Sequence, residues 1–368
     1  MFDMQWKCAQ AEVKDTRIKV HGIDPKETCA LGQKCKPTNG TEGVSGTCGL
    51  EHLTTHGISQ HRKLGAGLRS VYKKLIPSLY VRSTDTQRTY WSSVALLSGL
   101  QDSTAPTASI DMLPTSDDDL IPIETNCKKG KAILKALRNT SALKEPIAYI
   151  KKTLKDHNYI LPSKPSVEYN AADSIRAHVC HGATPKPKDN KPLDPPTVDS
   201  FFKAMDKVIH ALYFNSPSTP NHRIFMGPYL LNMKKDILNS ISLDSSTTLI
   251  QSPKKPKALS IFSAHDITIS SLLSALNIND SISPPYASNF IVELWAPTGY
   301  NSTSALMDYR LRFIYNGSPV QPSFCPSLDC PVSSFVGYLE SSLQLYTGTE
   351  TYLKSNVSPF KFEEECSA

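Results

Sequence analysis

Two segments far apart in the chain decide the fold class: Arg82-Ser83-Thr84-Asp85-Thr86-Gln87-Arg88-Thr89 and Ser263-Ala264-His265-Asp266. Each follows an apolar run typical of a buried strand, at residues 79–81 and 258–262. Each also precedes apolar residues at helical spacing, which after the second segment are Ile269, Leu272, Leu273 and Leu276. Both segments are therefore expected to be strand-to-helix turns, and they predict an α/β fold with a central mixed sheet flanked by helices.

The residue types in these turns suit phosphate chemistry. A helix N-terminus at the carboxyl edge of a sheet presents free backbone N–H groups to an anion. Arg82 supplies a guanidinium for phosphate oxygens, His265 can donate to a phosphoryl oxygen, and Asp266 can protonate a leaving alkoxide. The alternatives are a surface arginine and a His-Asp helix cap. The place of both turns directly after predicted strands favours the functional interpretation.

Other charged residues near these turns receive structural interpretations. We interpret Arg88 as an ion-pair partner and His61 as a packing or hydrogen-bonding residue. The aspartates without a comparable context are interpreted as solvated loop charges, and they are Asp117, Asp118, Asp119 and Asp280. The sequence has no P-loop, G-x-G-x-x-G, G-x-S-x-G or H-E-x-x-H motif, which argues against nucleotide, serine-hydrolase and zinc-protease chemistry.

Composition is that of a globular protein with room for more than one lobe. The chain has 368 residues, 39% hydrophobic and 20% charged, and a net charge of +6. The lysines are scattered, so nucleic acid is not an expected partner. An anionic substrate is compatible with this charge.

Cysteine and asparagine usage favour the lumen of the secretory pathway (Golgi, lysosomal or secreted). Among nine cysteines, Cys325 and Cys330 bracket a loop that a disulfide could close, and no zinc-like pair of C-x-x-C units occurs. Six N-x-S/T sequons are glycosylation candidates: Asn39, Asn139, Asn279, Asn301, Asn316 and Asn356. No transmembrane run occurs and the first residues do not resemble a signal peptide, so we expect a segment upstream of Met1.

Three regions are expected along the chain. Residues 1–50 read as an irregular segment containing cysteines, and 51–126 with 245–368 as the α/β core. Residues 127–244 read as a helical cap inserted into that core, with helices near 130–142 and 146–156. Strands are expected at 290–295 and 310–315, and a closing helix near 332–344. Residues 102–126 and 182–198 are expected to be surface connections.

Four motifs together resemble the histidine acid phosphatases, in branch 2 of the histidine phosphatase superfamily. They are Leu53-Thr54-x-x-Gly57-x-x-Gln60-His61, Arg82-Ser83-Thr84-Asp85-x-x-Arg88-Thr89, Ser263-Ala264-His265-Asp266 and Pro284-Pro285-Tyr286-Ala287-Ser288. The similarity runs from about residue 50 to the end. Within the family the chain is most similar to the 2-phosphoxylose phosphatase group, on Cys48-Gly49, Phe290-x-Val292-Glu293-Leu294-Trp295, Tyr315-Asn316-Gly317 and Ser323-Phe324-Cys325.

The resemblance implies a phosphoglycerate mutase-like fold and hydrolysis of a phosphomonoester without metal or organic cofactor. Arg82 and His265 would bind the transferring phosphoryl group, and Asp266 would donate the proton. The resemblance also implies two disulfides, Cys127–Cys366 and Cys325–Cys330. The remaining cysteines stay unassigned: Cys8, Cys29, Cys35, Cys48 and Cys180.

The family's nucleophile, a histidine in an R-H-G-x-R-x-P motif that ends the first central strand, is not found. His21-Gly22 is the one His-Gly pair before residue 50, but Val20 replaces the first arginine and Asp24 the second. Residues 13–19 are too charged for a buried parallel strand. We interpret His21 as a loop histidine, with a role as nucleophile as the disfavoured alternative.

The sequence thus predicts a lumenal phosphatase acting on a small phosphomonoester or a phosphorylated glycan, such as a 2-phosphoxylose-like group, through a phosphohistidine. Two rival interpretations remain open. One is a catalytically inactive, phosphatase-like protein that binds phosphate or another anion. The other is an N-terminally truncated fragment.

Overall fold

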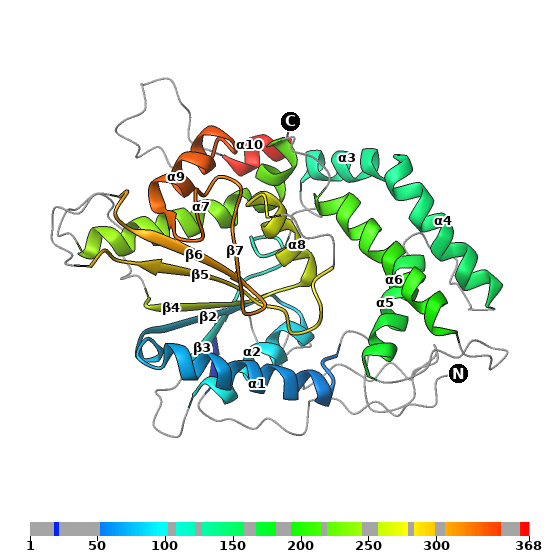
Figure 1. Cartoon of the computed structure of the whole chain (residues 1–368), viewed down its shortest axis with the longest axis horizontal. Coiled ribbons are helices and arrows are strands. Elements are labelled where there is room, and N and C mark those ends of the chain that lie inside the picture. The colour runs from blue at the N-terminus through cyan, green and yellow to red at the C-terminus, as the bar shows by residue number, and fades with distance from the viewer. Residues whose placement is uncertain are drawn as a thin grey trace.

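The structure, a computed structural model, describes residues 52–101, 108–121, 127–157, 167–181, 193–214, 219–244, 257–278, 283–298, 306–346 and 361–367, and the backbone of 18–21. Two sheets lie between helices, and a group of helices stands to one side (Figure 1). The strands are β1 (Ile18–His21), β2 (Leu79–Ser83), β3 (Ala108–Met112), β4 (Leu259–Ser263), β5 (Phe290–Trp295), β6 (Arg310–Tyr315), β7 (Ser318–Val320) and β8 (Cys330–Pro331).

The first sheet is parallel and has the strand order β1-β3-β2-β4. Strands β2 and β4 pair in register from Leu79 opposite Leu259 to Ser83 opposite Ser263. Because parallel strands in register end at the same edge, the two predicted turns meet there. The two predicted strands and their turns are confirmed.

The second sheet is antiparallel, with the order β5-β6-β7, and β8 also pairs with β6. Asn316 and Gly317 join β6 to β7 with φ values of +48° and +80°. Such a pair forms the two-residue hairpin turn that matches the twist of its strands. The predicted α/β fold class, with both parallel and antiparallel strands, is confirmed. The parallel pairs lie in one sheet and the antiparallel pairs in the other.

Two strands were not predicted. Residues 108–112 lie inside the expected connection 102–126, yet they form β3, with Ala108, Ile110 and Met112 buried. β1 pairs with β3 alone in the described sheet. The interpretation of His21 as a loop residue was therefore wrong. Residues 13–19 were judged too charged for a parallel strand buried on both faces, whereas a strand at the edge of a sheet needs fewer apolar residues.

The described helices cover both sides of the sheets. They are α1 (Thr55–Tyr72), α2 (Gln87–Leu100), α3 (Lys128–Leu137), α4 (Ser141–Asp156), α5 (Val167–Cys180), α6 (Pro195–Ile209), α7 (Thr219–Asp244), α8 (Asp266–Ala275), α9 (Val332–Ser341) and α10 (Phe362–Ser367), with a 3₁₀ turn at Ile76–Ser78 and a π turn at His210–Phe214. Helices α1 and α2 lie below the parallel sheet in Figure 1, and α7, α8 and α9 lie above the strands. No helix among these residues is long and apolar enough to cross a membrane.

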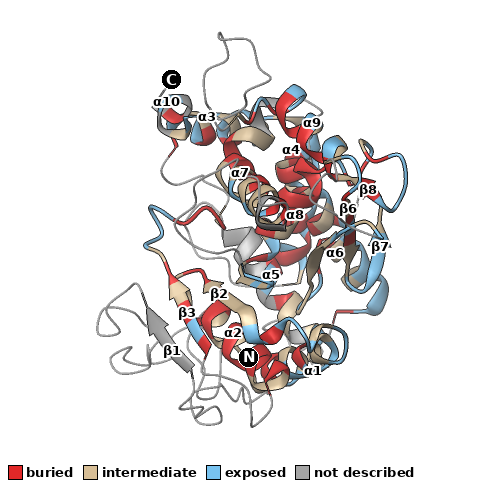
Figure 2. Cartoon of the chain, turned by 90° about the vertical axis from the view of Figure 1, so that its left-hand side faces the viewer, coloured by how far each residue is buried: buried red, intermediate tan, exposed pale blue. Residues whose placement is uncertain are grey.

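Three large apolar clusters hold these layers together. One joins α2 to β2 and β3, a second joins α7, α8 and α9 to β6, and the third lies within α4, α5 and α6. The buried residues line the inner sides of α2, α4 and α8 (Figure 2). Helix α7, from the predicted cap, contributes to the second cluster rather than the third. The division into core and cap stays a prediction, and the residues 1–50 lie largely outside the described ones.

Two disulfides confirm the predicted pairs. Cys127 bonds to Cys366 and Cys325 to Cys330, whereas Cys180 is free and exposed. The first bond ties α10 to the start of α3 across 239 residues of sequence. Closing so long a loop restricts the unfolded chain strongly. Cys8, Cys29, Cys35 and Cys48 lie outside the described residues.

Replacing Cys127 by serine is expected to lower the free energy of unfolding by about 2–5 kcal/mol, because the long loop is released in the unfolded state. Denaturant unfolding under oxidising conditions measures this. Cys180→Ser is the matched control and is expected to change stability by less than about 0.5 kcal/mol. Equal effects of the two substitutions would contradict the prediction.

Helices α1 and α2 approach closely at two glycines. A Cβ at Gly65 would lie 2.0 Å from the backbone oxygen of Leu96, and one at Gly99 would lie 2.1 Å from that of Arg62. Both clashes are with backbone, so no side-chain rotation relieves them. Gly67, on the same helix as Gly65, has no atom within 4 Å of its Cβ position.

Gly65→Ala is therefore expected to lower the free energy of unfolding by about 1–3 kcal/mol, the usual cost of overpacking. Gly67→Ala is expected to raise it by about 0.5–1 kcal/mol, because alanine restricts the unfolded chain and favours helix. Chemical denaturation of both variants gives the comparison. The same sign of change in both would show that α1 and α2 are not packed in this way.

Candidate functional site

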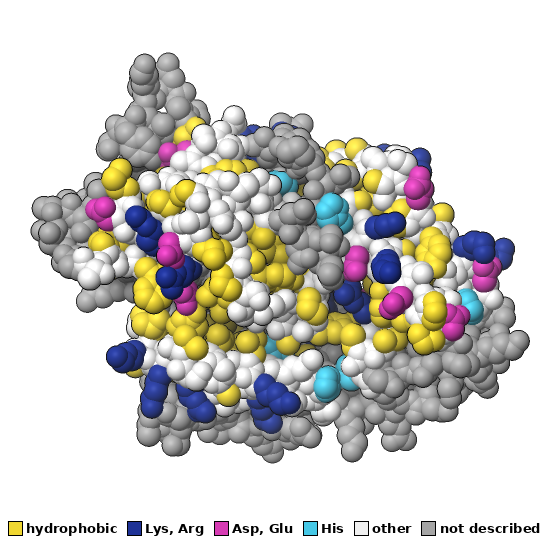
Figure 3. All heavy atoms as spheres, viewed as in Figure 1, with side chains coloured by type: hydrophobic (Ala, Val, Ile, Leu, Met, Phe, Trp, Pro, Cys, Tyr) yellow, Lys and Arg dark blue, Asp and Glu magenta, His cyan; other side chains and the backbone are white. Residues whose placement is uncertain are grey.

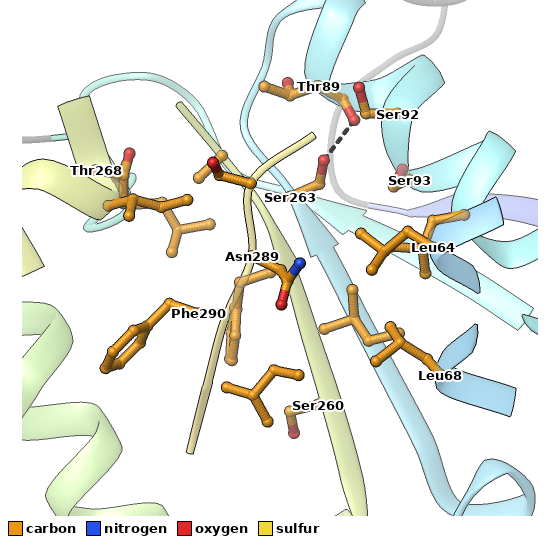
Figure 4. Close-up of a pocket in the computed structure, with 18 of the residues that line it drawn as sticks. Leu64, Leu68, Thr89, Ser92, Ser93, Ser260, Ser263, Thr268, Asn289 and Phe290 are labelled. Carbon is orange, nitrogen blue, oxygen red and sulfur yellow. Dashed lines mark hydrogen bonds between the residues drawn. The ribbon is translucent and has the colours of Figure 1, made fainter. Parts of the chain in front are cut away.

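The two turns are joined directly by hydrogen bonds. The Thr84 N–H donates to the Ser263 carbonyl at 3.1 Å, which continues the β2–β4 ladder by one bond. The Ser263 hydroxyl donates to the Thr89 carbonyl at 2.7 Å (Figure 4). The starts of α2 and α8 are thereby held at one sheet edge, as the sequence predicted. Each helix begins there with backbone N–H groups that have no partner within the helix.

His265 lies between these turns and is 9% exposed. Its Nδ1 lies 3.2 Å from Nη2 of Arg88, and its Nε2 lies 3.1 Å from Oγ1 of Thr84. A guanidinium can only donate, so Nδ1 accepts and Nε2 carries the proton that Thr84 accepts. Burial, and next the charge of Arg88, lower the pKa of His265 to about 4. The imidazole is therefore neutral with a defined tautomer.

Thr268 fixes the position of His265 from the first turn of α8. The Thr268 hydroxyl accepts from the His265 N–H at 3.2 Å and donates to the Leu120 carbonyl at 2.6 Å. This contact ties the start of α8 to the segment that follows β3. The same segment carries two aspartates that face Arg82.

Arg82 is held by Asp118 and Asp119. Its Nη2 donates to Asp119 Oδ1 and lies 3.6 Å from Asp118 Oδ1, while its guanidinium stacks 5.3 Å from the ring centre of Phe262. The interpretation of Asp118 and Asp119 as solvated charges was wrong, since they are 2% and 7% exposed. Asn232 of α7 donates to Asp119 at 2.8 Å.

Asp117 is exposed, as expected, and Asp280 lies outside the described residues. Burial raises the pKa of Asp118, against the opposing effects of the Leu120 N–H and Arg82. The buried Nε of Arg82 has no hydrogen-bond partner within the described part of the chain.

Asp266 is exposed and begins α8, where its Oδ1 accepts from the Ile267 N–H at 2.9 Å. The cavity that it lines also contains Asp173 and Arg176 of α5, and Tyr286. Burial, and next the charge of Asp266, raise the pKa of Asp173, while Arg88 and Arg176 oppose this. The predicted proton donor thus lies in an accessible charged cluster.

Three of these charged residues were not predicted for the site. Arg88 was interpreted as an ion-pair partner, but it contacts the catalytic candidate His265. Its place in the first turn of a helix at the phosphate edge was the available signal. Asp173 and Arg176 come from α5 (Val167–Cys180), far before His265 in the sequence, and their sequence context carried no signal for this cavity.

Histidines gather at one end of the same cavity, between α1 and α5. Thr54 and Nε2 of His181 are 2.9 Å apart, and the rings of His56 and His181 lie 5.2 Å apart. Half-buried His61 also lines the cavity, and burial lowers its pKa to about 4. In the described residues, no three His, Cys, Asp or Glu side chains are grouped to hold a metal ion.

His21 is not brought next to His265. Its Cα pairs with that of Asp111, which in turn pairs with Arg82, so β3 separates β1 from β2. Two strand spacings put His21 and Arg82 roughly 10 Å apart at the backbone. The full pairing of β2 with β4 leaves no strand between the two turns. The nucleophile is therefore still unassigned, and the roles of Arg82, His265 and Asp266 stay predictions.

Arg88→Ala is expected to raise the pKa of His265 from about 4 part of the way towards 6.5, because the nearby positive charge is lost while the burial remains. NMR titration of the His265 ring measures this. Arg62→Ala, at an exposed position on α1, is the control and is expected to leave that pKa unchanged. An unchanged pKa in Arg88→Ala would exclude the Arg88–His265 contact.

The same shift makes stability depend on pH. The pKa of His265 is lower in the folded chain than in the unfolded one, so the unfolded state binds more protons between about pH 6.5 and pH 4. The free energy of unfolding is therefore expected to fall as pH drops through this window. In His265→Asn this part of the pH dependence should disappear in denaturant melts.

Comparison with known proteins gives one family match. A model of the histidine phosphatase superfamily (branch 2) matches residues 10–193 and 197–316. The match begins 40 residues before the resemblance noted above, and it includes His21.

Two kinds of relative match at nearly the same identity. Mouse lysophosphatidic acid phosphatase type 6 is 24% identical over 331 residues, covering 86% of this chain and 70% of that protein. Human 2-phosphoxylose phosphatase 1 is 26% identical over 334 residues, covering 82% of this chain and 64% of that protein.

Among solved structures, the apo phytase of Hafnia alvei has a TM-score of 0.57 at 14% identity, covering 89% of this chain and 95% of its own. The phytase of Citrobacter braakii has a TM-score of 0.53 at 14% identity, covering 92% of this chain and 98% of its own. At 14% sequence identity, this likeness shows a similar fold and nothing further.

Proposed function

Because this chain belongs to the histidine phosphatase superfamily (branch 2), we propose that it is a phosphomonoester hydrolase whose site lies where β2 and β4 end. The observation that carries the proposal is the pairing of two turns, which puts Arg82, Arg88, His265 and Asp266 along one cavity. Their arrangement supplies cations and donors for a phosphate and an exposed acid for the leaving group.

The geometry supports separate roles for these side chains. The first turn of α2 and Arg88 present donors to the equatorial phosphate oxygens. Both ring nitrogens of His265 are occupied by Arg88 and Thr84, so His265 holds Arg88 in place at the phosphate edge and is not the attacking group. Asp266, which is exposed at the cavity, is placed to protonate the leaving oxygen.

For the substrate, we propose a small phosphomonoester or a phosphorylated glycan, without metal or organic cofactor. The human relative that is named for 2-phosphoxylose supports the glycan candidate. A covalent phosphohistidine would need a nucleophile beyond the residues that meet at this edge, so the attacking group is left unassigned.

The alternative is an inactive protein that keeps an anion site. Two observations favour this alternative. The guanidinium of Arg82 already contacts the carboxylates of Asp118 and Asp119. In addition, β3 lies between β1 and β2, so His21 is kept away from the phosphate edge. Such a protein would bind phosphate without turning over an ester.

We also propose a location in the lumen of the secretory pathway. The two disulfides support an oxidising compartment. Of the candidate glycosylation sites, Asn139 and Asn316 are exposed, although the Asn316 amide donates to Ser288 at 3.2 Å. Asn39, Asn279, Asn301 and Asn356 lie outside the described residues.

The proposal is tested with p-nitrophenyl phosphate at acid pH. His265→Ala is expected to lower kcat/KM about 100-fold or more, because Arg88 loses the ring that positions its guanidinium at the phosphate edge. Asp266→Asn is expected to lower kcat on a phosphate ester of a poor leaving group by about 100-fold or more, since protonation then matters most.

Asp117→Asn, which removes an exposed carboxylate in the loop after β3, is the matched control and should leave both rates unchanged. Binding of vanadate is measured in parallel by calorimetry. Vanadate binding with no turnover in the parent chain would overturn the enzyme in favour of the anion-binding alternative. Neither binding nor turnover would overturn the site itself.

A further inference from the structure

Two strands each have one edge that is not paired in the described sheets. β4 pairs with β2 alone, and β5 pairs with β6 alone. The other side of each strand therefore carries a row of backbone N–H and C=O groups outside any ladder, over five residues in β4 and six in β5. All of these residues are half-buried or exposed, whereas a strand that lies between helices is usually buried on both faces.

The two unpaired edges face the same cavity. Every residue of β4 and every residue of β5 lines it. Because side chains alternate between the two faces of a strand, a strand with all of its residues on one cavity presents its edge to that cavity. β2, which has a strand on each side, contributes only Tyr80 and Arg82. The cavity, of about 2800 Å³, therefore lies between the edges of the two sheets.

The two edges run along the cavity in opposite directions. β4 ends at the phosphate edge, where Asp266 follows it. Tyr286, shortly before β5, is close enough to Asp266 to interact with it electrostatically, so β5 begins near the same edge. Further along β5, Glu293 accepts a hydrogen bond from Tyr72, the last residue of α1. A strand placed between them would be parallel to one edge and antiparallel to the other.

Helices bound the cavity on the two faces of such a strand. Leu64 and Leu68 of α1 point into it from one side (Figure 4), and they also contact the apolar cluster of α2, β2 and β3. Met233 of α7 and Ile269 of α8 line it from the other side, and they contact the cluster of α7, α8, α9 and β6. Figure 3 shows hydrophobic side chains gathered in the hollow above α1. A strand between these helices would therefore have apolar neighbours on both faces.

Both ends of the cavity carry polar groups with an excess of positive charge. Arg88 and the starts of two helices lie at the phosphate edge. Away from that edge, four lysines and two carboxylates line the cavity, and they are Lys73, Lys74, Lys235, Lys257, Asp236 and Glu293. One of these carboxylates already accepts a hydrogen bond from Tyr72. An occupant that is apolar in its middle and acidic at its ends matches this distribution of charge.

The backbone edges decide the chemical class of the occupant. A hydrocarbon chain would cover the edge N–H and C=O groups without giving them partners, which costs free energy. An extended polypeptide pairs with both edges at once, as in β-strand addition. Its side chains alternate between the two faces and so reach the helices on both sides.

We propose that the cavity between β4 and β5 is a slot for one added β-strand. The occupant is an extended segment of another polypeptide, with five or six apolar residues, the lengths of β4 and β5, and acidic residues at its ends. Its binding joins the two sheets into one. This inference concerns binding, and it stands whether or not the chain hydrolyses a phosphate ester.

The experiment titrates the full chain against a fluorescently labelled peptide, Asp-Asp-Val-Ile-Val-Ile-Val-Asp-Asp, and follows binding by fluorescence anisotropy. The control peptide has the same sequence with N-methyl groups on its three valines. The N–H groups of alternate residues point to the same side of a strand, so these methyl groups block one of the two ladders. We expect the control peptide to bind at least about tenfold more weakly, because two or three hydrogen bonds are lost.

Hydrogen exchange in the presence of the unmodified peptide locates the added strand. At a peptide concentration well above the dissociation constant, the backbone amides of β4 and β5 are expected to exchange at least about tenfold more slowly. β7 pairs with β6 alone and is the internal control. Its amides are expected to keep their exchange rates.

Leu68→Trp is expected to weaken binding of the unmodified peptide at least about fivefold, because the indole overpacks the side of the slot that α1 forms. Lys63→Trp is the matched control, since Lys63 is an exposed residue of the same helix that does not line the cavity. The control variant should bind the peptide as the parent chain does.

Several outcomes would overturn the inference. If the N-methylated peptide binds as tightly as the unmodified one, the cavity is a general apolar site and not a strand slot. If slower exchange appears in β7 and not in β4 and β5, the peptide adds to a different edge. If the peptide does not bind and sedimentation velocity shows a dimer, a second copy of the chain occupies the cavity. Absence of peptide binding to a monomer would overturn it as well.

Discussion

The parallel ladder between β2 and β4 is the constraint on which the rest of the structure depends. Five residue pairs in register bring Ser83 and Ser263 to one level, and the Thr84 N–H extends the ladder beyond the strands. Two helices must then begin side by side, with their unpaired N–H groups at the same edge. Helix packing, the position of His265 and the mouth of the cavity all follow from this edge.

Buried polar groups around the edge are mutually dependent. Arg82 is compensated by Asp118 and Asp119, and Asp119 is in turn held by Asn232. His265 stays neutral because burial and Arg88 both oppose its protonation. A buried charge that loses its partner destabilises the folded state. Arrangements of these side chains that break the contacts are therefore disfavoured. They also connect the sheet edge to α7 and to the segment after β3.

Elements with a strong local pattern could be predicted from the sequence. The α8 stripe from Ile269 to Leu276 and the alternation along Arg310–Tyr315 are periodic, and both elements formed as predicted. β3 was missed although its apolar residues alternate with Ser109 and Asp111, because the Pro/Ser/Asp-rich stretch around it indicated a surface connection. β1 was missed because the charged residues before it do not suit a buried strand, whereas in the described sheet it pairs on one side only.

By itself, the sequence determined the two strand-to-helix turns and the family, because local periodicity and short motifs carry that information. The disulfide partners followed from the resemblance to that family. Only the tertiary structure decided that Asp118 and Asp119 bind Arg82 and that Arg88 fixes the tautomer of His265. It also decided that a large cavity with both apolar and charged lining residues adjoins the phosphate edge. These features depend on the distance between segments that lie far apart along the chain, and no local pattern encodes such a distance.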